Sequence, residues 1–397
     1  MSQKIIGILG IGGYLGRFTA KKLLDTGHQI IGAQRSNVDF FSEYPNFQYE
    51  MVDVIYEDQL IKFIEKCDIV VNCVSPSHLY GKMIKDVICK KNKIYVDPSD
   101  MSFEPDRTHV AGRCVGSCGY IPGLSEFLAY AIAKEKFDII TRCVMYQGGF
   151  DGCSPGAFVD MILGAGNKNF YGDSYISESK VLPFSCDIKK KYITPFSKNE
   201  VILKPLINSD SINLQKKIGA KEFYFFSAYD NMETMKFFMK LLLEVSKYPK
   251  KVAAKNIRKK LQERIENNMQ FGNQEVEAYL FIELEGIKNN KKRLFDVELV
   301  SKNVNKICGY FLAEVVIELI LHPEKAVEGF SYGAEIVPSN YIERVKEEIR
   351  EEGNIEIIEK INKERFPVEM LKRPYIKQSD QERKLTYQLP ITIQLKQ

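Results

Sequence analysis

The stretch "KIIGILGIGGYLGRFTAKKLL", residues 4–24, places a cluster of glycines between an apolar run and an amphipathic run. The glycines are Gly10, Gly12, Gly13 and Gly16, so their spacing is GxxGxxG with one extra glycine rather than GxGxxG. The apolar run predicts a buried strand at 4–9, and the amphipathic run predicts a helix at 14–26. The glycines between them predict a tight turn that leads directly from strand to helix.

Strand and helix patterns continue to alternate to about residue 100. Strands are expected at 28–36, 47–54, 68–76 and 93–99, and helices at 56–67 and 81–92. The connections are short enough to be right-handed crossovers between neighbouring parallel strands. This alternation is typical of a Rossmann-type, doubly wound parallel sheet, and it places the fold in the α/β class.

A glycine-rich turn at the first crossover of such a sheet is a typical dinucleotide-binding site, although a turn without a ligand is the alternative. Gly10 permits the tight turn, and Gly16 lets the helix pack closely on the strand. Gly12 and Gly13 let backbone N–H groups approach a diphosphate at the positive end of the helix dipole. The residues expected around the diphosphate are Gly10, Gly12, Gly13, Tyr14, Leu15 and Gly16.

The end of the second strand indicates which dinucleotide binds. An NAD site expects an Asp or Glu there, which bonds the ribose 2′-OH. This chain has Gln34, Arg35 and Ser36 instead. A guanidinium suits a 2′-phosphate and can stack beside adenine, so we predict NADP(H) in preference to NAD(H). The alternative is that Arg35 faces solvent. Further cofactor contacts are expected at Asp53, Asn72, Cys73, Val74, Pro76 and Gly119.

The pattern changes after about residue 120. A helix is expected at 123–136, where Ser125 and Glu126 could cap its start. Strands are expected at 139–150 and 221–230, and a hairpin at 278–300 that turns at Asn289-Asn290-Lys291-Lys292. A lysine-rich helix is expected at 248–268, where the pattern favours a solvated face over the alternative of an anion patch. These elements predict a second, α+β domain built on a mainly antiparallel sheet.

The C-terminal part contains an apolar helix at 304–321, an amphipathic helix at 338–353 and a strand with strict period two at 385–395. We therefore divide the chain into a dinucleotide-binding domain (1–120), an inserted α+β domain (121–303), returning helices that complete the first domain (304–360), and a C-terminal extension with an edge strand (361–397). The edge strand could pair with another subunit or dock on its own chain, and we expect a homodimer.

Composition excludes several functional classes. The net charge is +4 over 397 residues, which gives no electrostatic reason to expect nucleic acid or an anionic membrane surface. No apolar run reaches the length of a membrane-spanning helix, and the start of the chain lacks the pattern of a signal peptide. Nine scattered cysteines and four scattered histidines predict no metal site and favour the reducing cytoplasm.

Four side chains are candidates for a proton donor: Tyr120, His78, Tyr146 and Asp151. His78 could lie near a nicotinamide, or it could begin a helix without a chemical role. Tyr120 lies in the turn "GYIPG", where simple packing is the alternative. Tyr146 and Asp151 flank the glycines of "YQGGFDG", together with Gln147, and such glycines indicate close approach by a ligand or by backbone.

Several of these segments resemble a known family. The segments "ILGIGGYLGRFTAKKLL" (8–24), "VVNCVSPSHLYGKMIKDVICKKNKIYVDPSD" (70–100) and "GSCGYIPGLSEFLAYAIA" (116–133) together resemble the saccharopine dehydrogenase-like NAD(P)-dependent oxidoreductases. The segment "FLAEVVIELILHPEKAVEGFSYGAEIVPSNYIERV" (311–345) is similar to a later part of that family. Two positions depart from its pattern, because Ser75 stands where the family often has Gly and Ile121 where it often has Asp.

The resemblance implies that the chain leaves the first domain near residue 120, builds the second, and returns through the 304–321 helix. It places the active site in the cleft between them. It also implies hydride transfer at a C–N bond, so the leading prediction is an NADPH-dependent reductase of a C=N bond in an amino-acid-derived, small-molecule substrate. Reduction of a C=C or C=O bond is a second prediction, and a non-catalytic NADP-binding sensor or scaffold is a third.

Overall fold

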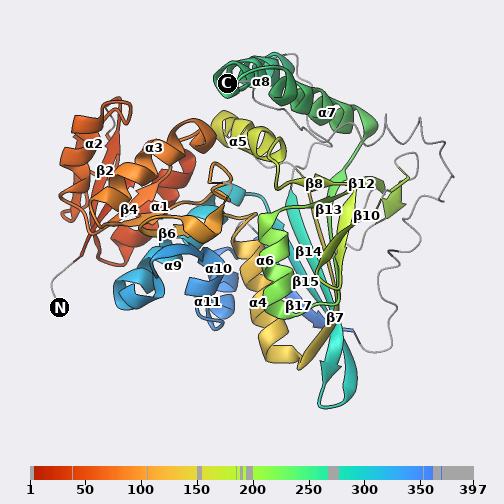
Figure 1. The fold of residues 1–397 in the computed structure, drawn as a ribbon. Coiled ribbons are helices and arrows are strands. Elements are labelled where there is room, and N and C mark those ends of the chain that lie inside the picture. The colour runs from red at the N-terminus through yellow and green to blue at the C-terminus, as the bar shows by residue number, and fades with distance from the viewer. Residues whose placement is uncertain are drawn as a thin grey trace.

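The computed structural model describes residues 4–37, 39–104, 106–149, 154–184, 186–187, 191–193, 200–266, 277–351, 353–360 and 368. Its framework consists of a parallel sheet, formed mainly by the first third of the chain, and a larger mixed sheet formed mainly by the middle (Figure 1). Within the described ranges, no helix combines the length and the apolar character that crossing a membrane requires.

The parallel sheet confirms the Rossmann-type prediction. Its strands are β1 (Ile5–Leu9), β2 (Gln29–Gln34), β3 (Phe47–Met51), β4 (Ile69–Asn72), β5 (Ile94–Val96), β6 (Arg113–Gly116) and β16 (Gly329–Tyr332). They lie in the order β3-β2-β1-β4-β5-β6-β16, and every neighbouring pair is parallel. The strand order reverses between β1 and β4, which is where a sheet of this kind opens a ligand crevice.

Helices cover both faces of this sheet because the strands are apolar on both sides. Along β1, Ile6 and Ile8 pack into the larger core of the molecule, which includes side chains of α1 (Tyr14–Asp25) and α9 (Val304–Leu321). Leu9 points to the other face, toward α2 (Glu57–Ile64) and α3 (Ser77–Lys90). Helices α1 and α9 approach closely, since a Cβ at Gly309 would lie 2.6 Å from Phe18 Cβ. The returning helix is therefore an integral part of the first domain.

The second sheet has ten strands in the described part of the chain and is mainly antiparallel, as predicted. They are β7 (Ile139–Gly148), β8 (Tyr171–Gly172), β9 (Ser174–Ser177), β10 (Lys180–Pro183), β11 (Tyr192–Ile193), β12 (Glu200–Ile207), β13 (Glu222–Tyr229), β14 (Ala278–Lys288), β15 (Lys291–Ser301) and β17 (Gly353–Glu359). Only the β13–β7 pair is parallel among the pairings described. Asn289 and Asn290 form the β14–β15 turn with φ angles of 50° and 60°, which confirms the predicted hairpin. The predicted turn is two residues too long, because Lys291 and Lys292 pair with β14 as the start of β15.

Helix α4 (Leu124–Lys136) and helix α6 (Ser209–Ile218) pack between the two sheets, and their apolar side chains join the larger core. Three further helices form a separate group: α5 (Pro155–Ala165), α7 (Met232–Lys247) and α8 (Lys250–Glu266). Their own core contains Phe158, Ile162, Leu241, Ile257 and Leu261. These three cap helices lie side by side above both sheets in Figure 1, with α5 next to α3.

The last described segments divide between the two sheets. After α9, the short helix η2 (Pro323–Lys325) precedes β16, and α10 (Gly333–Ile336) and α11 (Tyr341–Glu348) follow it. Tyr341 is buried against Phe127 and Phe311. Strand β17 then pairs with β15 in the second sheet. The predicted returning segment 304–360 is thus too long, because alternating apolar residues of β17 complete the second sheet rather than the first. The predicted strand at 385–395 lies outside the described residues.

Candidate functional site

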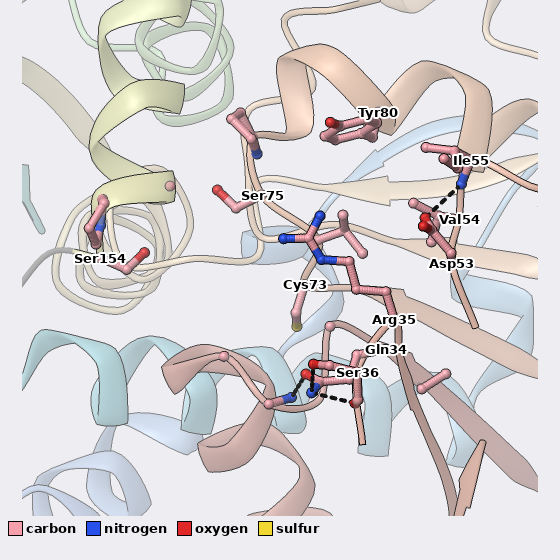
Figure 2. A pocket seen from close by; sticks show the side chains of 18 of the residues that line it. Gln34, Arg35, Ser36, Asp53, Val54, Ile55, Cys73, Ser75, Tyr80 and Ser154 are labelled. Atoms are coloured by element: carbon pink, nitrogen blue, oxygen red, sulfur yellow. Dashed lines mark hydrogen bonds between the residues drawn. The ribbon is translucent and has the colours of Figure 1, made fainter. Parts of the chain in front are cut away.

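A cavity of about 1020 Å³ lies at the carboxyl ends of β1, β2, β3 and β4. The sheet side of the cavity is lined by Gly10, Gly12, Gly13, Ala33, Gln34, Arg35, Ser36, Val52, Asp53, Val54, Ile55, Cys73, Val74, Ser75 and Pro76. The helix side adds Tyr80, Ser154, Pro155, Gly156, Arg258, Leu261 and Gln262. Most of the residues that the sequence predicted as cofactor contacts therefore share one cavity, part of which is shown in Figure 2.

The glycine turn forms the base of this cavity. Gly10 has a φ of +80°, and a Cβ there would lie 2.6 Å from the carbonyl oxygen of Cys73. A Cβ at Gly16 would lie 2.5 Å from Gly10 O, so Gly16 allows α1 to pack on the turn but does not line the cavity. Gly13 is the N-cap of α1, and the first turn holds no acidic residue. Such a helix start suits an anionic group.

Two predicted diphosphate contacts, Tyr14 and Leu15, do not line the cavity. Tyr14 is exposed, and its ring packs under the Arg17 guanidinium at 5.0 Å. Leu15 is partly buried against the larger core. Their side chains thus face away from the turn, and any contribution to a diphosphate would come from the backbone at the helix start.

The end of β2 presents one fixed and one unpaired side chain. Gln34 Oε1 accepts a hydrogen bond of 2.8 Å from Gly12 N, and Gln34 Nε2 donates to the Ser36 carbonyl oxygen at 2.9 Å. Arg35 is exposed and forms no ion pair with any residue that the structure describes. Figure 2 shows its guanidinium projecting into the cavity. An arginine in this position is available to bind an anionic ligand.

Asp53 lies after β3, where its Oδ1 accepts a hydrogen bond of 3.3 Å from Ile55 N. Val54 and Ile55 line the cavity beside it. An apolar surface with a carboxylate at its edge suits a flat heterocycle that carries an amino group, such as adenine. This part of the cavity lies beyond the end of β2 and therefore next to Arg35.

Asn72 supports the cavity from behind rather than lining it. Its Nδ2 donates to Tyr95 Oη and to Asp97 Oδ2, each at 2.9 Å, and its Oδ1 accepts from Val74 N at 3.2 Å. The Tyr95 hydroxyl also donates to Asp97. All three side chains are buried, and burial raises the pKa of Asp97. This network fixes the loop that carries Cys73, which does line the cavity.

His78 is held away from the cavity by a carboxylate of the cap helices. Its Nδ1 lies 3.0 Å from Asp160 Oδ1, and its Nε2 lies 2.6 Å from Ser102 Oγ. Asp160 also accepts hydrogen bonds from Ser77 N at 2.8 Å and from Ser75 Oγ at 2.9 Å. These contacts favour a structural role for His78 at the start of α3 over a role as proton donor.

Two other predicted proton donors, Tyr146 and Tyr120, do not line the cavity. Tyr146 is buried and stacks on Phe281 with ring centroids 5.2 Å apart, and burial raises its pKa well above the ordinary value. Tyr120 packs against the larger core. Gly119 packs on the neighbouring backbone, because a Cβ there would lie 2.7 Å from Pro98 O. Asp151 lies outside the described residues.

Comparison with known proteins identifies the fold of the chain. The profile of the NAD dependent epimerase/dehydratase family matches residues 6–91, which run from β1 to the end of α3. Among solved structures, saccharopine dehydrogenase (L-Glu forming) from Saccharomyces cerevisiae aligns with 90% of this chain and 100% of its own, with 13% identity and a TM-score of 0.59. The chain has the saccharopine dehydrogenase fold. The resemblance that the sequence motifs indicated is thereby confirmed for the fold.

Other solved structures match a smaller part. Serine dehydrogenase from Escherichia coli aligns with 25% of this chain and 62% of its own, with 14% identity and a TM-score of 0.20. Vestitone reductase from alfalfa aligns with 24% of this chain and 36% of its own, with 19% identity and a TM-score of 0.22. No curated protein sequence matches the chain. The comparisons thus show the saccharopine dehydrogenase fold, with a family match over residues 6–91.

The two departures from the saccharopine dehydrogenase-like pattern have local explanations. Ser75 lines the cavity and bonds Asp160, so it joins the sheet loop to the cap helices. Ile121 is partly buried against the larger core. A carboxylate nevertheless lies next to this turn, since Glu126 in the first turn of α4 accepts hydrogen bonds at Oε2 from Gly123 N and Ser125 Oγ, each at 2.6 Å. Burial, with the charge of nearby Asp210, raises the pKa of Glu126 to about 7.

The helix side of the cavity was not found from the sequence. Arg258 lies in the lysine-rich segment whose pattern favours a solvated helix face, yet it lines the cavity. Tyr80 and Ser154 carry no motif that would have identified them. Among the thiols, Cys114 Sγ lies 3.4 Å from Cys89 Sγ. In the described ranges, no three His, Cys, Asp or Glu side chains gather as a metal site would require.

Proposed function

We propose that this protein is an NADPH-dependent reductase. The observation that carries the proposal is Arg35, a guanidinium without an ion-pair partner among the described residues, which projects into the cavity beside the glycine turn (Figure 2). The preference for NADPH rests on this cation, because the acidic residue that an NAD site uses for the ribose 2′-OH is missing at the end of β2.

The residues present fit a dinucleotide. Side chains at Gly10 and Gly12 would collide with Cys73 O and with Gln34 Oε1, so the turn admits only backbone near the diphosphate. Arg35 would bind the 2′-phosphate, and Asp53 would accept a hydrogen bond from the adenine amino group. Cys73, Ser75 and neighbouring residues would hold the ribose and nicotinamide. When bound, the nicotinamide supplies the hydride, and the chain supplies binding and orientation.

For the substrate, we propose an amino-acid-derived small molecule with a C=N bond. The support is the fold, which this chain shares with a saccharopine dehydrogenase, and fold alone does not determine a substrate. Asp151, one of the four predicted proton donors, lies outside the described residues and stays a prediction. A C=C or C=O substrate and a non-catalytic NADP sensor remain the alternatives.

The experiment has two stages. Fluorescence titration with NADPH and NADH measures cofactor binding, and the absence of binding for both would overturn the proposal. NADPH oxidation is then measured with a panel of amino acids paired with 2-oxo acids, and with carbonyl and enone compounds alone. Turnover that requires both an amine and an oxo acid supports a C=N substrate. Turnover with a single carbonyl or alkene substrate supports the second alternative, and binding without turnover supports the sensor.

A homodimer in the cytoplasm is proposed as the working state of the enzyme. Light scattering coupled to size-exclusion chromatography measures the oligomeric state directly. A mass of about twice the 45.6 kDa chain is expected, and a monomer would contradict this part of the proposal.

A further inference from the structure

One wall of the cavity comes from α8, which lies outside the Rossmann domain. Arg258, Leu261 and Gln262 lie about one turn apart on this helix and line the cavity together with the glycine turn and Arg35. Leu261 is buried in the core that joins α8 to α5 and α7. Packing of Leu261 therefore fixes the rotation of α8 about its axis, and this rotation places Arg258 at the cavity.

The charges around the cavity are unbalanced. Three of the described lining residues are charged: Arg35, Arg258 and Asp53. Neither arginine forms an ion pair with another described residue, and both are exposed. Two guanidinium groups at one cavity repel each other, and an anionic ligand bound between them would be attracted to both. The cavity thus favours a ligand with more negative charge than the glycine turn alone would select.

The position of α8 indicates which part of a dinucleotide Arg258 reaches. Helix α8 packs against α5 and also contacts α3. Tyr80 in the first turn of α3 lines the cavity and packs in the same core as Val54, which follows β3. This side of the cavity is formed by the ends of β2 and β3, where Arg35 lies. The diphosphate, by contrast, has the N–H groups and the dipole of α1.

We propose that Arg258 is a second cation for the 2′-phosphate of NADPH, supplied by the cap helices. A 2′-phosphate carries a charge of about −1.5 to −2 at neutral pH, so Arg35 alone leaves part of it unmatched. The inference rests on the proposed cofactor and adds that the dinucleotide is held between the Rossmann domain and the cap. The hydrogen bonds of Asp160 to Ser75 and Ser77 keep that cap on α3.

The test is a set of binding titrations with NADPH and NADH on the full chain. Arg258→Ala is expected to weaken NADPH binding roughly tenfold, the loss typical of one charged hydrogen bond, and to leave NADH binding unchanged. Lys255→Ala is the matched control, because Lys255 is an exposed cation of the same helix that does not line the cavity. Arg258→Lys is expected to recover part of the affinity, since it retains the charge.

Two outcomes would overturn the inference. If Arg258→Ala weakens NADPH and NADH binding equally, Arg258 contacts another part of the dinucleotide. If Arg258→Ala binds NADPH as tightly as Lys255→Ala does, Arg258 is not part of the site. Circular dichroism melting without cofactor shows whether each variant is folded. If the proposed preference for NADPH is wrong, the result is different: the wild-type protein would bind NADH as tightly as NADPH, and Arg35→Ala would not change the NADPH affinity.

Discussion

Asp160 on α5 accepts hydrogen bonds from both the backbone N–H and the ring Nδ1 of His78, each at 3.0 Å. The same carboxylate accepts from Ser75 and Ser77, so it caps the start of α3 from another part of the chain. A side-chain cap normally comes from the residue just before a helix, but here Pro76 occupies that position and cannot cap. Asp160 thereby fastens the cap helices to the Rossmann domain beside the cavity.

Removal of this carboxylate is expected to destabilise the protein. Asp160→Ala leaves Ser77 N, His78 N and the His78 ring without their acceptor, and the free energy of unfolding should fall by about 1–3 kcal/mol. Chemical denaturation measures the change. Asp58→Ala serves as the control, because Asp58 is an exposed carboxylate at the start of α2. If both variants lose the same small amount, the hydrogen bonds of Asp160 contribute little to stability.

Glu126 is expected to make stability depend on pH. Burial raises its pKa from 4.5 to about 7, so between these values the folded state binds a proton that the unfolded state has released. Stability from this group is therefore complete below about pH 4.5 and falls as the pH rises toward 7. Melting temperatures of the wild-type protein and Glu126→Gln across this range measure the effect. The variant should show a flatter profile, whereas Glu135→Gln, an exposed change in the same helix, should not.

The glycine turn is expected to tolerate no side chain at Gly10. Gly10→Ala combines a φ of +80° with a Cβ placed 2.6 Å from Cys73 O, and it should both lower stability and abolish cofactor binding. Gly27→Ala isolates the backbone strain, because Gly27 has a φ of +84° and no heavy atom within 4 Å of the added Cβ. Comparable losses of cofactor binding in the two variants would mean that close packing at Gly10 does not shape the site.

The sequence predicted the parts of the molecule that depend on local pattern. Apolar runs and glycines sufficed for the Rossmann strands, because buried parallel strands are apolar on both faces. Asn289 and Asn290 marked the β14–β15 turn, because both residues readily adopt positive φ. The position of Gln34, Arg35 and Ser36 at the cavity was also predictable, since the carboxyl ends of the strands face the ligand crevice in this fold.

The parts that depend on tertiary packing were not predictable. Arg258 belongs to a helix rich in lysine, and only the burial of Leu261 determines which face meets the cavity. His78 has the chemistry of a proton donor, but Asp160, 82 residues away in sequence, holds it in a structural role. Along β7, Tyr146 and its sequence neighbours point to opposite faces of the sheet. No local pattern shows that the face of Tyr146 belongs to a buried aromatic cluster.

Selection of NADPH by Arg35 is best tested by direct titration of both nicotinamide cofactors into the wild-type protein and Arg35→Ala. We expect the wild-type protein to bind NADPH more tightly than NADH. We also expect a roughly tenfold loss of NADPH affinity in the variant, with NADH binding unchanged. Equal affinities in the wild-type protein, together with an unaltered NADPH affinity in Arg35→Ala, would show that Arg35 does not select the cofactor.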